Sequence, residues 1–255
     1  MGFKLISKFF NYKDKFQERT NVGGSNNMKI TAFLPCRQGS QRVPRKNIKQ
    51  FANVEHGLIE IKLQQLLSTN NVDSVVLSSN DKEVIKYANG LKNTKLRVHV
   101  REESLSSSLT STDALVDHAL DLIQDGHILW THVTSPFCDA RLYQSILEAY
   151  KKVLPDGFDS LMTVNEIQGF VWDKNGPINY DREQEKWPRT QTLSPFYEVN
   201  SAVFLSSVEN YEQLGDRIGF KPYLYKMDKI EGFDIDWNDD FKLAEAIYLN
   251  NTSAV

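Results

Sequence analysis

The chain has 255 residues, a net charge of −3, and 40% hydrophobic and 25% charged residues. This length suits one α/β domain with a large core, and the composition is that of a soluble globular protein. The weak negative charge argues against a general nucleic-acid or membrane-surface binder. Two isolated cysteines, Cys36 and Cys138, indicate neither a disulfide framework nor a zinc site. They suit a reducing cytoplasm, which is the predicted location.

The first 27 residues differ in pattern from the rest of the chain. Cations alternate there with large apolar residues, and no apolar run is long enough for a signal-peptide core or a membrane span. Residues 22–27 predict a flexible linker. We interpret residues 1–27 as an extension, either an amphipathic helix that docks on a partner or membrane surface, or a disordered tail. Residues 28–255 are predicted to form a single domain.

The stretch from Ile30 to Asn47 begins with an apolar run, residues 30–34, that predicts a buried strand. Pro35 is expected to end this strand, because proline gives no N–H to a ladder. Gly39 in the following loop allows backbone to approach a ligand closely, and backbone N–H groups with basic side chains can bind phosphates. A solvated basic loop is the alternative, since neither the Walker pattern nor G-x-G-x-x-G is present. The cations of this loop, which we call the basic loop, are Arg37, Arg42, Arg45 and Lys46.

Strand and helix patterns then alternate along the chain. Strands are predicted over residues 72–78, 96–100, 128–133, 160–164 and 221–227, and helices over residues 58–67, 84–88, 113–123 and 142–153. Alternation of this kind implies right-handed βαβ units and a parallel sheet. Ligands in such sheets bind beyond the carboxyl ends of the strands, where the basic loop falls. Residues 165–199 lose the rhythm and predict an insertion that covers a site or packs on another subunit.

Asp234 and Asp236 stand two residues apart, just before a helix predicted over residues 241–249. Strand alternation would put both carboxylates on one face, where they repel each other unless a cation lies between them. Hard oxygen ligands of this kind suit Mg²⁺ completed by water and substrate phosphates. An Asp-x-Asp pair alone is a weak signal, because solvated acidic turns are common. Asp239 or Asp240 is expected to cap the helix.

Several of these segments, in this order, resemble the acylneuraminate cytidylyltransferases, the CMP-sialic acid synthetase-like enzymes. The resemblance spans roughly residues 29–250. The matching residues are Leu34-Pro35-Cys36-Arg37, Gly39-Ser40, Pro44-Arg45-Lys46-Asn47, Arg101, Leu105, Thr134-Ser135-Pro136-Phe137, Arg189, Gln191, Leu193, Tyr197, Asn200 and Asp234-Ile235-Asp236. The departures are Gln41, Ser108, His132, Ser201 and Phe204, where the family has Lys, Asp, Gln, Gly and Tyr.

This resemblance implies a Rossmann-like three-layer α/β sandwich with a mostly parallel sheet and a small dimerisation or lid insertion. It implies transfer of CMP from CTP to a 2-keto-3-deoxy sugar acid by a homodimer, with Mg²⁺ on Asp234 and Asp236. The implied nucleotide-binding residues are Pro35, Arg37, Gly39, Ser40, Lys46, Asn47, Arg101 and His132. The implied sugar-binding residues are Arg189, Gln191, Tyr197 and Asn200. Arg37, Lys46 and Asp236 are the expected catalytic residues.

Each assignment has a plainer alternative. A histidine at a strand end, such as His132, is more often a satisfied structural group than a functional one. Arg189 suits a substrate carboxylate, which a guanidinium binds bidentately, but a surface ion pair fits equally well. The protein could instead serve another sugar, such as Kdo or a sugar 1-phosphate, or be a weakly catalytic nucleotide-binding module. Retention of both aspartates argues for an active enzyme, and the missing G-x-G-x-x-G argues against an NAD-dependent oxidoreductase.

Overall fold

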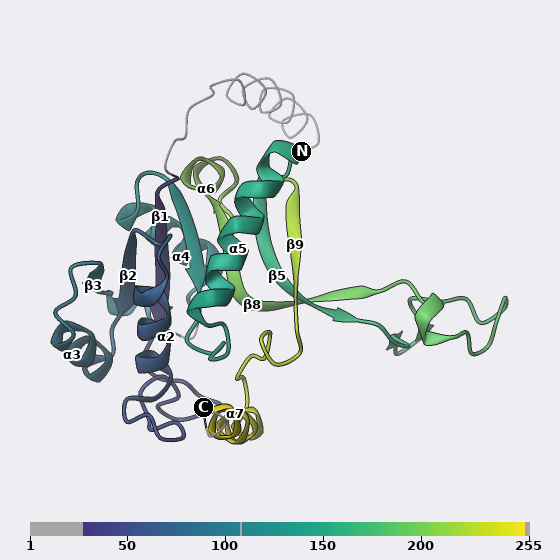
Figure 1. The fold of residues 1–255 in the computed structure, drawn as a ribbon, viewed down its shortest axis with the longest axis horizontal. Coiled ribbons are helices and arrows are strands. Elements are labelled where there is room, and N and C mark those ends of the chain that lie inside the picture. Colours follow the sequence, from purple (N-terminus) through teal and green to yellow (C-terminus); the bar gives the residue numbers. More distant parts are fainter. Residues whose placement is uncertain (1–27, 108, 253–255) are drawn as a thin grey trace.

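The computed structural model describes residues 28–107 and 109–252, so the predicted N-terminal extension lies outside the described residues. Its centre is a seven-stranded sheet in the order β3-β2-β1-β4-β8-β5-β9 (Figure 1). Strand β8 runs antiparallel to both of its neighbours, and the other neighbouring pairs are parallel. The strands are β1 (Ile30–Cys36), β2 (Ser74–Ser79), β3 (Leu96–Val100), β4 (His127–Thr131), β5 (Ser160–Ile167), β8 (Phe196–Ser207) and β9 (Pro222–Met227).

Helices cover both faces of this sheet. One face packs on α2 (Gly57–Ser68), α3 (Lys82–Gly90) and α5 (Ala140–Val153), and the other on α4 (Thr112–Leu122) and α6 (Val208–Leu214). Alternation along β1 explains this division, because Ala32 and Leu34 join the first core and Phe33 joins the second. The predicted three-layer α/β sandwich with a mostly parallel sheet is confirmed.

The prediction that Pro35 ends the first strand is wrong. Strand β1 continues to Cys36, and Pro35 lies in register with Ser78 of β2. Pairing of β1 with β4 stops at Phe33, so β1 has one partner strand at Pro35. Proline is tolerated at such a position, because a strand that is paired on one side needs fewer N–H donors.

Strands β5 and β8 continue beyond the body of the sheet as a two-stranded projection (Figure 1). Its far part holds the short pair β6 (Trp172–Asp173) and β7 (Gly176–Pro177) and the turn η3 (Thr190–Thr192). We call residues 164–199 the arm. It occupies the stretch where the sequence predicted an insertion over residues 165–199.

The last helix, α7 (Asn238–Thr252), packs on the segment that follows the basic loop. The rings of Phe51 and Phe241 meet edge to face with centroids 5.2 Å apart, and Lys49 lies 3.7 Å over the Phe241 ring. The helix starts earlier than the predicted Phe241. Asp240 lies in its first turn and accepts the backbone N–H of Trp237 at 2.7 Å. Within the described residues, none of the helices is long and apolar enough to cross a bilayer.

Ser201 replaces the glycine of the resembled family and adopts a φ of 59°. A left-handed backbone costs an L-residue about 1–2 kcal/mol. Glycine avoids this cost, but part of the gain is lost because glycine makes the unfolded chain more flexible. We expect Ser201→Gly to raise the free energy of unfolding by about 0.5–1 kcal/mol, measured as a higher urea midpoint at unchanged slope. Ala202→Gly, in the same strand without a positive φ, should lower it. A lower midpoint for Ser201→Gly would contradict the strain.

Candidate active site

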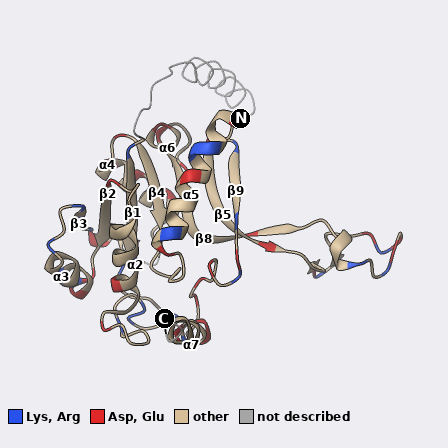
Figure 2. Ribbon diagram, viewed as in Figure 1, with Lys and Arg blue, Asp and Glu red and all other residues tan. Residues whose placement is uncertain are grey.

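The basic loop and the segment before α7 meet at the carboxyl edge of the parallel strands. Lys46 Nζ donates a 2.6 Å hydrogen bond to the carbonyl of Ile235, across 189 residues of sequence. The N–H of Ile235 donates to the carbonyl of Thr134, just past β4, at 2.9 Å. Figure 2 shows charged segments of both signs gathered where the loop meets α7. Two distant segments and the end of β4 thus build one site.

Lys46 lies among the carboxylates of this segment. Burial lowers the pKa of Lys46, and the charges of Asp234 and Asp236 oppose that effect. A desolvated ammonium beside two carboxylates is suited to bind a further anion, provided that a cation balances the carboxylates.

Asp234 is the more buried of the two aspartates. Burial raises the pKa of Asp234 and the charge of Asp236 adds to the effect, while a hydrogen bond from Thr134 and the charge of Lys46 oppose it. Its Oδ1 atom is buried and has no hydrogen-bond partner. Because buried polar atoms are nearly always satisfied, such an oxygen is typical of a site that a ligand or ion completes.

Asp236 lies on the open side, with its side chain 56% exposed. It forms an ion pair with Arg42 at 3.2 Å, and the Arg42 guanidinium lies 4.6 Å over the Trp237 ring. An exposed pair of this kind contributes at most about 1 kcal/mol, so Asp236 can exchange Arg42 for another cation. The sequence placed Arg42 in the basic loop but gave no sign of this pairing.

The strand geometry predicted for the aspartate pair is wrong. The structure assigns no strand to residues 228–237, so alternation does not align the carboxylates. Instead the Ile235 side chain is buried in the core while its backbone is bonded to Lys46 and Thr134. The backbone of Ile235 is therefore fixed, and Asp234 and Asp236 flank it on either side of the contact with Lys46. Asp236 lies close enough for its charge to raise the pKa of Asp234.

The donor set fits Mg²⁺. The two aspartates offer hard carboxylate oxygens, and Mg²⁺ is usually bound by one or two carboxylates together with waters and substrate phosphates. Among the described residues, no cluster of three or more His, Cys, Asp or Glu side chains could hold an ion. The partnerless Oδ1 of Asp234 is the atom that such an ion would satisfy.

The basic loop is anchored at its base and open in its middle. Asn47 Nδ2 donates to the carbonyl of Arg37 at 2.9 Å, and the N–H of Gln38 donates to Asn80 Oδ1 at 2.8 Å. Gly39 has a φ of 83°, and a Cβ there would meet nothing within 4 Å. The loop therefore leaves space above its backbone on the side where a ligand would approach.

Arg101 lies behind this loop, at the end of β3, and is 3% exposed. Burial lowers the pKa of Arg101 and the nearby charge of Arg37 adds to this effect. Its Nε–H is buried without an acceptor. A guanidinium donor left in this state is expected where a ligand supplies the acceptor.

A family model described as cytidylyltransferase matches residues 31–255. The chain belongs to the cytidylyltransferase family. The family predicted from the sequence is therefore confirmed, as is the prediction of a nucleotidyltransferase enzyme.

Named relatives agree with this assignment. A pseudaminic acid cytidylyltransferase of Campylobacter jejuni is 28% identical over 237 residues, which cover 89% of this chain and 100% of the relative. An N-acylneuraminate cytidylyltransferase of Streptococcus agalactiae is 27% identical over 219 residues, 84% of this chain. The chain matches only 52% of that relative's length.

Solved structures share the fold at low identity. A CMP:2-keto-3-deoxy-manno-octonic acid synthetase complexed with CTP has a TM-score of 0.61 at 15% identity, covering 88% of this chain and 99% of its own. A 4-diphosphocytidyl-2C-methyl-D-erythritol synthase of Anaerococcus prevotii has a TM-score of 0.62 at 15% identity, covering 88% of this chain and 97% of its own. These likenesses support the Rossmann-like fold of the cytidylyltransferase.

His132 does not fit the nucleotide-binding role predicted for it. Its Nε2 accepts from Trp130 Nε1 at 3.0 Å, and its Nδ1 lies 2.9 Å from the carbonyl of Ser201, to which it must donate. Burial lowers the pKa of His132 to about 4, so the ring is neutral. Neither ring nitrogen is left for a ligand, and the structural alternative is the better interpretation.

The predicted sugar-binding residues fall into two groups. Asn200 is 4% exposed and its amide is used internally, with Oδ1 accepting from Thr163 at 2.6 Å and Nδ2 donating to Asn165 at 2.9 Å. A Cβ on Gly232 would lie 2.7 Å from Asn200 Nδ2. Asn200 therefore supports the segment that leads to Asp234.

Arg189, Gln191 and Tyr197 form the second group, and all three are exposed on the arm. The arm projects away from the edge where the basic loop meets α7 (Figure 1). A single chain thus does not bring Arg189 and Gln191 to the aspartate pair.

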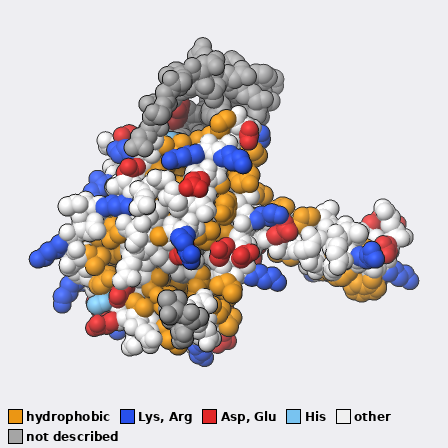
Figure 3. Space-filling model, viewed as in Figure 1, with side chains coloured by type: hydrophobic (Ala, Val, Ile, Leu, Met, Phe, Trp, Pro, Cys, Tyr) orange, Lys and Arg blue, Asp and Glu red, His pale blue; other side chains and the backbone are white. Residues whose placement is uncertain are grey.

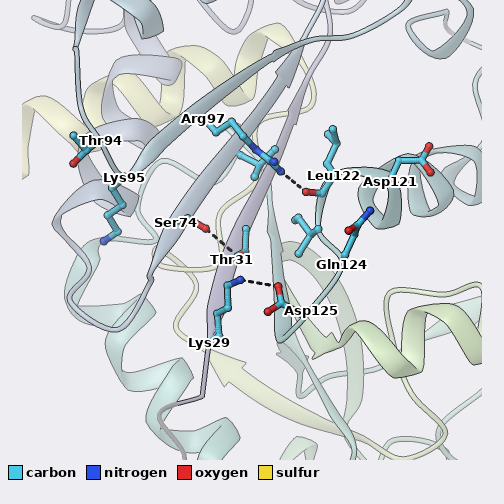
Figure 4. Close-up of a pocket in the computed structure, with 12 residues that line it drawn as sticks. Lys29, Thr31, Ser74, Thr94, Lys95, Arg97, Asp121, Leu122, Gln124 and Asp125 are labelled. Carbon is cyan, nitrogen blue, oxygen red and sulfur yellow. Dashed lines mark hydrogen bonds and ion pairs between the residues drawn. The ribbon is translucent and has the colours of Figure 1, made fainter.

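A separate cavity of about 480 Å³ lies at the opposite end of the cytidylyltransferase sheet (Figure 4). Its cations are engaged within the protein: Lys29 pairs with Asp125 at 2.6 Å, and Arg97 donates to the carbonyl of Leu122. It is lined from the starts of β1 and β2, so it is distinct from the site at the carboxyl edge.

The raised pKa of Asp234 predicts a stability cost at neutral pH. A raised carboxyl pKa contributes stability that is present at low pH and lost as the pH rises through the folded-state value. We expect Asp234→Asn to raise the melting temperature of the ligand-free protein at pH 7 by about 2–4 °C. This gain should shrink toward acid pH, where the wild-type carboxyl is protonated.

Asp236→Asn is the matched control, because Asp236 is exposed and its ion pair contributes little. Its melting temperature should stay within about 2 °C of wild type. A destabilised Asp234→Asn protein at pH 7 would show that the Asp234 carboxylate is stabilising, contrary to this expectation.

Proposed function

We propose that this cytidylyltransferase transfers CMP from CTP to a 2-keto-3-deoxy sugar acid of the sialic, legionaminic or pseudaminic type and releases pyrophosphate. The observation that carries the proposal is the 2.6 Å contact between Lys46 and Ile235, which joins the basic loop to the aspartate pair. The relatives named for pseudaminic acid and N-acylneuraminate support a sugar acid as the acceptor.

The charges of the substrates define what the site must do. The oxygen of the anomeric hydroxyl, next to the sugar's own carboxylate, gives up its proton to solvent and forms a bond to the α-phosphorus. The bond from that phosphorus to the oxygen that bridges it to the β-phosphate breaks, and pyrophosphate leaves. Both reactants are anions, so positive groups must screen them before they can meet. In this proposal Arg37 and Lys46 bind the phosphates and stabilise the charge that builds on the leaving pyrophosphate.

The remaining nucleotide contacts come from the edge of the basic loop. Gly39 lets the backbone approach the phosphates, Pro35 borders the site near the end of β1, Ser40 donates its hydroxyl, and Asn47 keeps the loop in place. Arg101 gives its unpaired Nε–H to the nucleotide. Among these groups, the Nε–H of Arg101 is the donor that the protein leaves unsatisfied, whereas Asn47 acts by holding the loop.

Asp234 and Asp236 would hold the Mg²⁺ that accompanies CTP. When bound, the ion would screen the triphosphate and polarise the α-phosphate. The backbone hydrogen bond between Ile235 and Thr134 positions the segment that carries both carboxylates.

The arm is assigned to a second copy of the chain. It exposes large apolar side chains, and such patches mark interaction surfaces (Figure 3). They include Ile167, Phe170, Trp172, Ile178 and Trp187. In a homodimer, the arm of one protomer would present Arg189 and Gln191 to the sugar carboxylate at the partner's site.

The reaction is tested by pyrophosphate release from CTP and Mg²⁺ with a panel of 2-keto-3-deoxy sugar acids. We expect release with one sugar, and a loss of about 10²-fold or more in kcat for Asp236→Ala, because the metal site is incomplete. Asp239→Ala is the control, since that side chain is 94% exposed in the next turn and should leave the rate unchanged. No release with any sugar, from a protein that binds CTP, would refute the proposed reaction.

The role of the arm is tested by mixing two inactive variants, Asp236→Ala and Arg189→Ala, through co-expression. If arms serve the partner, a mixed dimer holds one intact site, and random pairing returns about one quarter of wild-type activity. Asp236→Ala mixed with Lys46→Met should return none, because both changes lie in the body. Equal failure of the two mixtures would place Arg189 at the site of its own chain, and full activity of Arg189→Ala alone would place it outside any site.

A further inference from the structure

Lys62, in α2, is a fully buried lysine on the face of the sheet beneath the candidate site. Its Nζ donates to the carbonyl of Ser135 at 2.8 Å, to the hydroxyl of Tyr143 at 2.9 Å and to the carbonyl of Cys138 at 3.3 Å. Burial lowers the pKa of Lys62 to about 8. An ammonium whose three acceptors are neutral is expensive to bury, so packing alone does not account for a lysine here.

Two of those acceptors belong to residues 134–138, which we call the β4 loop. Gln65, one turn further along α2, donates to the carbonyl of Pro136 in the same loop at 2.6 Å. Helix α2 therefore holds the β4 loop through side chains that reach its backbone. The loop has little other regular structure to fix it, since β4 ends at Thr131.

The β4 loop in turn holds the aspartate segment. The carbonyl of Thr134 accepts the N–H of Ile235 at 2.9 Å, and this contact places Thr134 next to Asp234. The carbonyl of Ile235 is also the acceptor of Lys46. A displacement of the β4 loop would therefore move Asp234 and the Lys46 contact together.

We propose that Lys62 is a positioning residue for the metal pair: it fixes the β4 loop, and through Thr134 it fixes Asp234 and Ile235. This inference rests on the proposed role of Asp234 and Asp236 as metal ligands. The contacts of Lys62 Nζ are with Ser135, Cys138 and Tyr143, and they include neither the basic loop nor Asp234 or Asp236. Its effect on the aspartates therefore passes through the backbone of the β4 loop. Residues that orient metal ligands in this way commonly change metal affinity by 10–100-fold.

The test compares Lys62→Met with Lys95→Met in the full-length protein. Lys95, just before β3, also donates its Nζ to two backbone carbonyls at the end of α2, those of Leu67 and Thr69, so it offers the matched loss of a lysine that contacts the same helix. Two quantities are measured: hydrogen exchange of the Ile235 amide without metal, and the affinity for Mn²⁺, as a probe of the Mg²⁺ site, with saturating CTP.

For Lys62→Met we expect faster exchange at Ile235 and Mn²⁺ affinity about tenfold weaker, with the KM for CTP at saturating metal within about twofold of wild type. Lys95→Met should lower the melting temperature and leave both quantities unchanged. If Lys62→Met lowers the melting temperature and changes neither exchange nor affinity, Lys62 is merely structural and the inference is overturned.

Tyr143→Phe keeps the inference testable if Lys62→Met does not fold. It removes one of the three acceptors of Lys62 and keeps the aromatic ring in the core, and should produce a smaller change in the same direction. Unchanged Ile235 exchange in this variant would overturn the inference. A separate measurement shows whether the two aspartates bind the metal. If they do not, Asp236→Ala leaves the Mn²⁺ affinity unaltered. Hydrogen exchange of the Ile235 amide would still decide whether Lys62 positions this segment.

Discussion

The arrangement of the candidate site depends on one half-buried contact, the hydrogen bond from Lys46 to the carbonyl of Ile235. It closes the chain on itself, because the loop after the first strand and the segment before the last helix are far apart in sequence. Packing of Phe51 on Phe241 supports the same closure from the apolar side. One segment supplies cations and the other carboxylates, and the contact sets the distance between them, so the proposed reaction would need both segments.

The site is organised at a cost in stability. Burial lowers the pKa of Lys46 and raises that of Asp234, so each group is held in surroundings that oppose its charge. Arg101 and Asp234 also keep buried atoms without partners. A bound triphosphate would place negative charge beside Lys46 and Arg101, and a bound cation would place positive charge beside Asp234. Together the two ligands would compensate the buried charges. Perturbed groups clustered in this way are characteristic of functional sites, where preorganised charge is retained for the ligand.

The βαβ layout could be predicted from the sequence because hydrophobic periodicity depends only on residues that are close together in the chain. The sequence did not predict features that distant partners decide. Residues 234–236 read as a strand by alternation, but Lys46 and Thr134 set their path. His132 matched a family position, yet its ring is satisfied by Trp130 and by Ser201 across the sheet. Lys62 had no distinguishing spacing at all, and only the fold shows that it is buried.

Strand direction explains why the arm starts where it does. In a parallel sheet the carboxyl ends of the strands form the ligand edge. Strand β8 is antiparallel to β4 and β5, so its first residues, rather than its last, reach that edge, next to the end of β5. The arm links these two ends and therefore leaves the body at the ligand edge itself. Under the proposed function, the parallel strands supply the nucleotide half of the site, while a segment that begins beside them extends outward with Arg189. A change in the arm would then alter the choice of acceptor without disturbing the contact between Lys46 and Ile235.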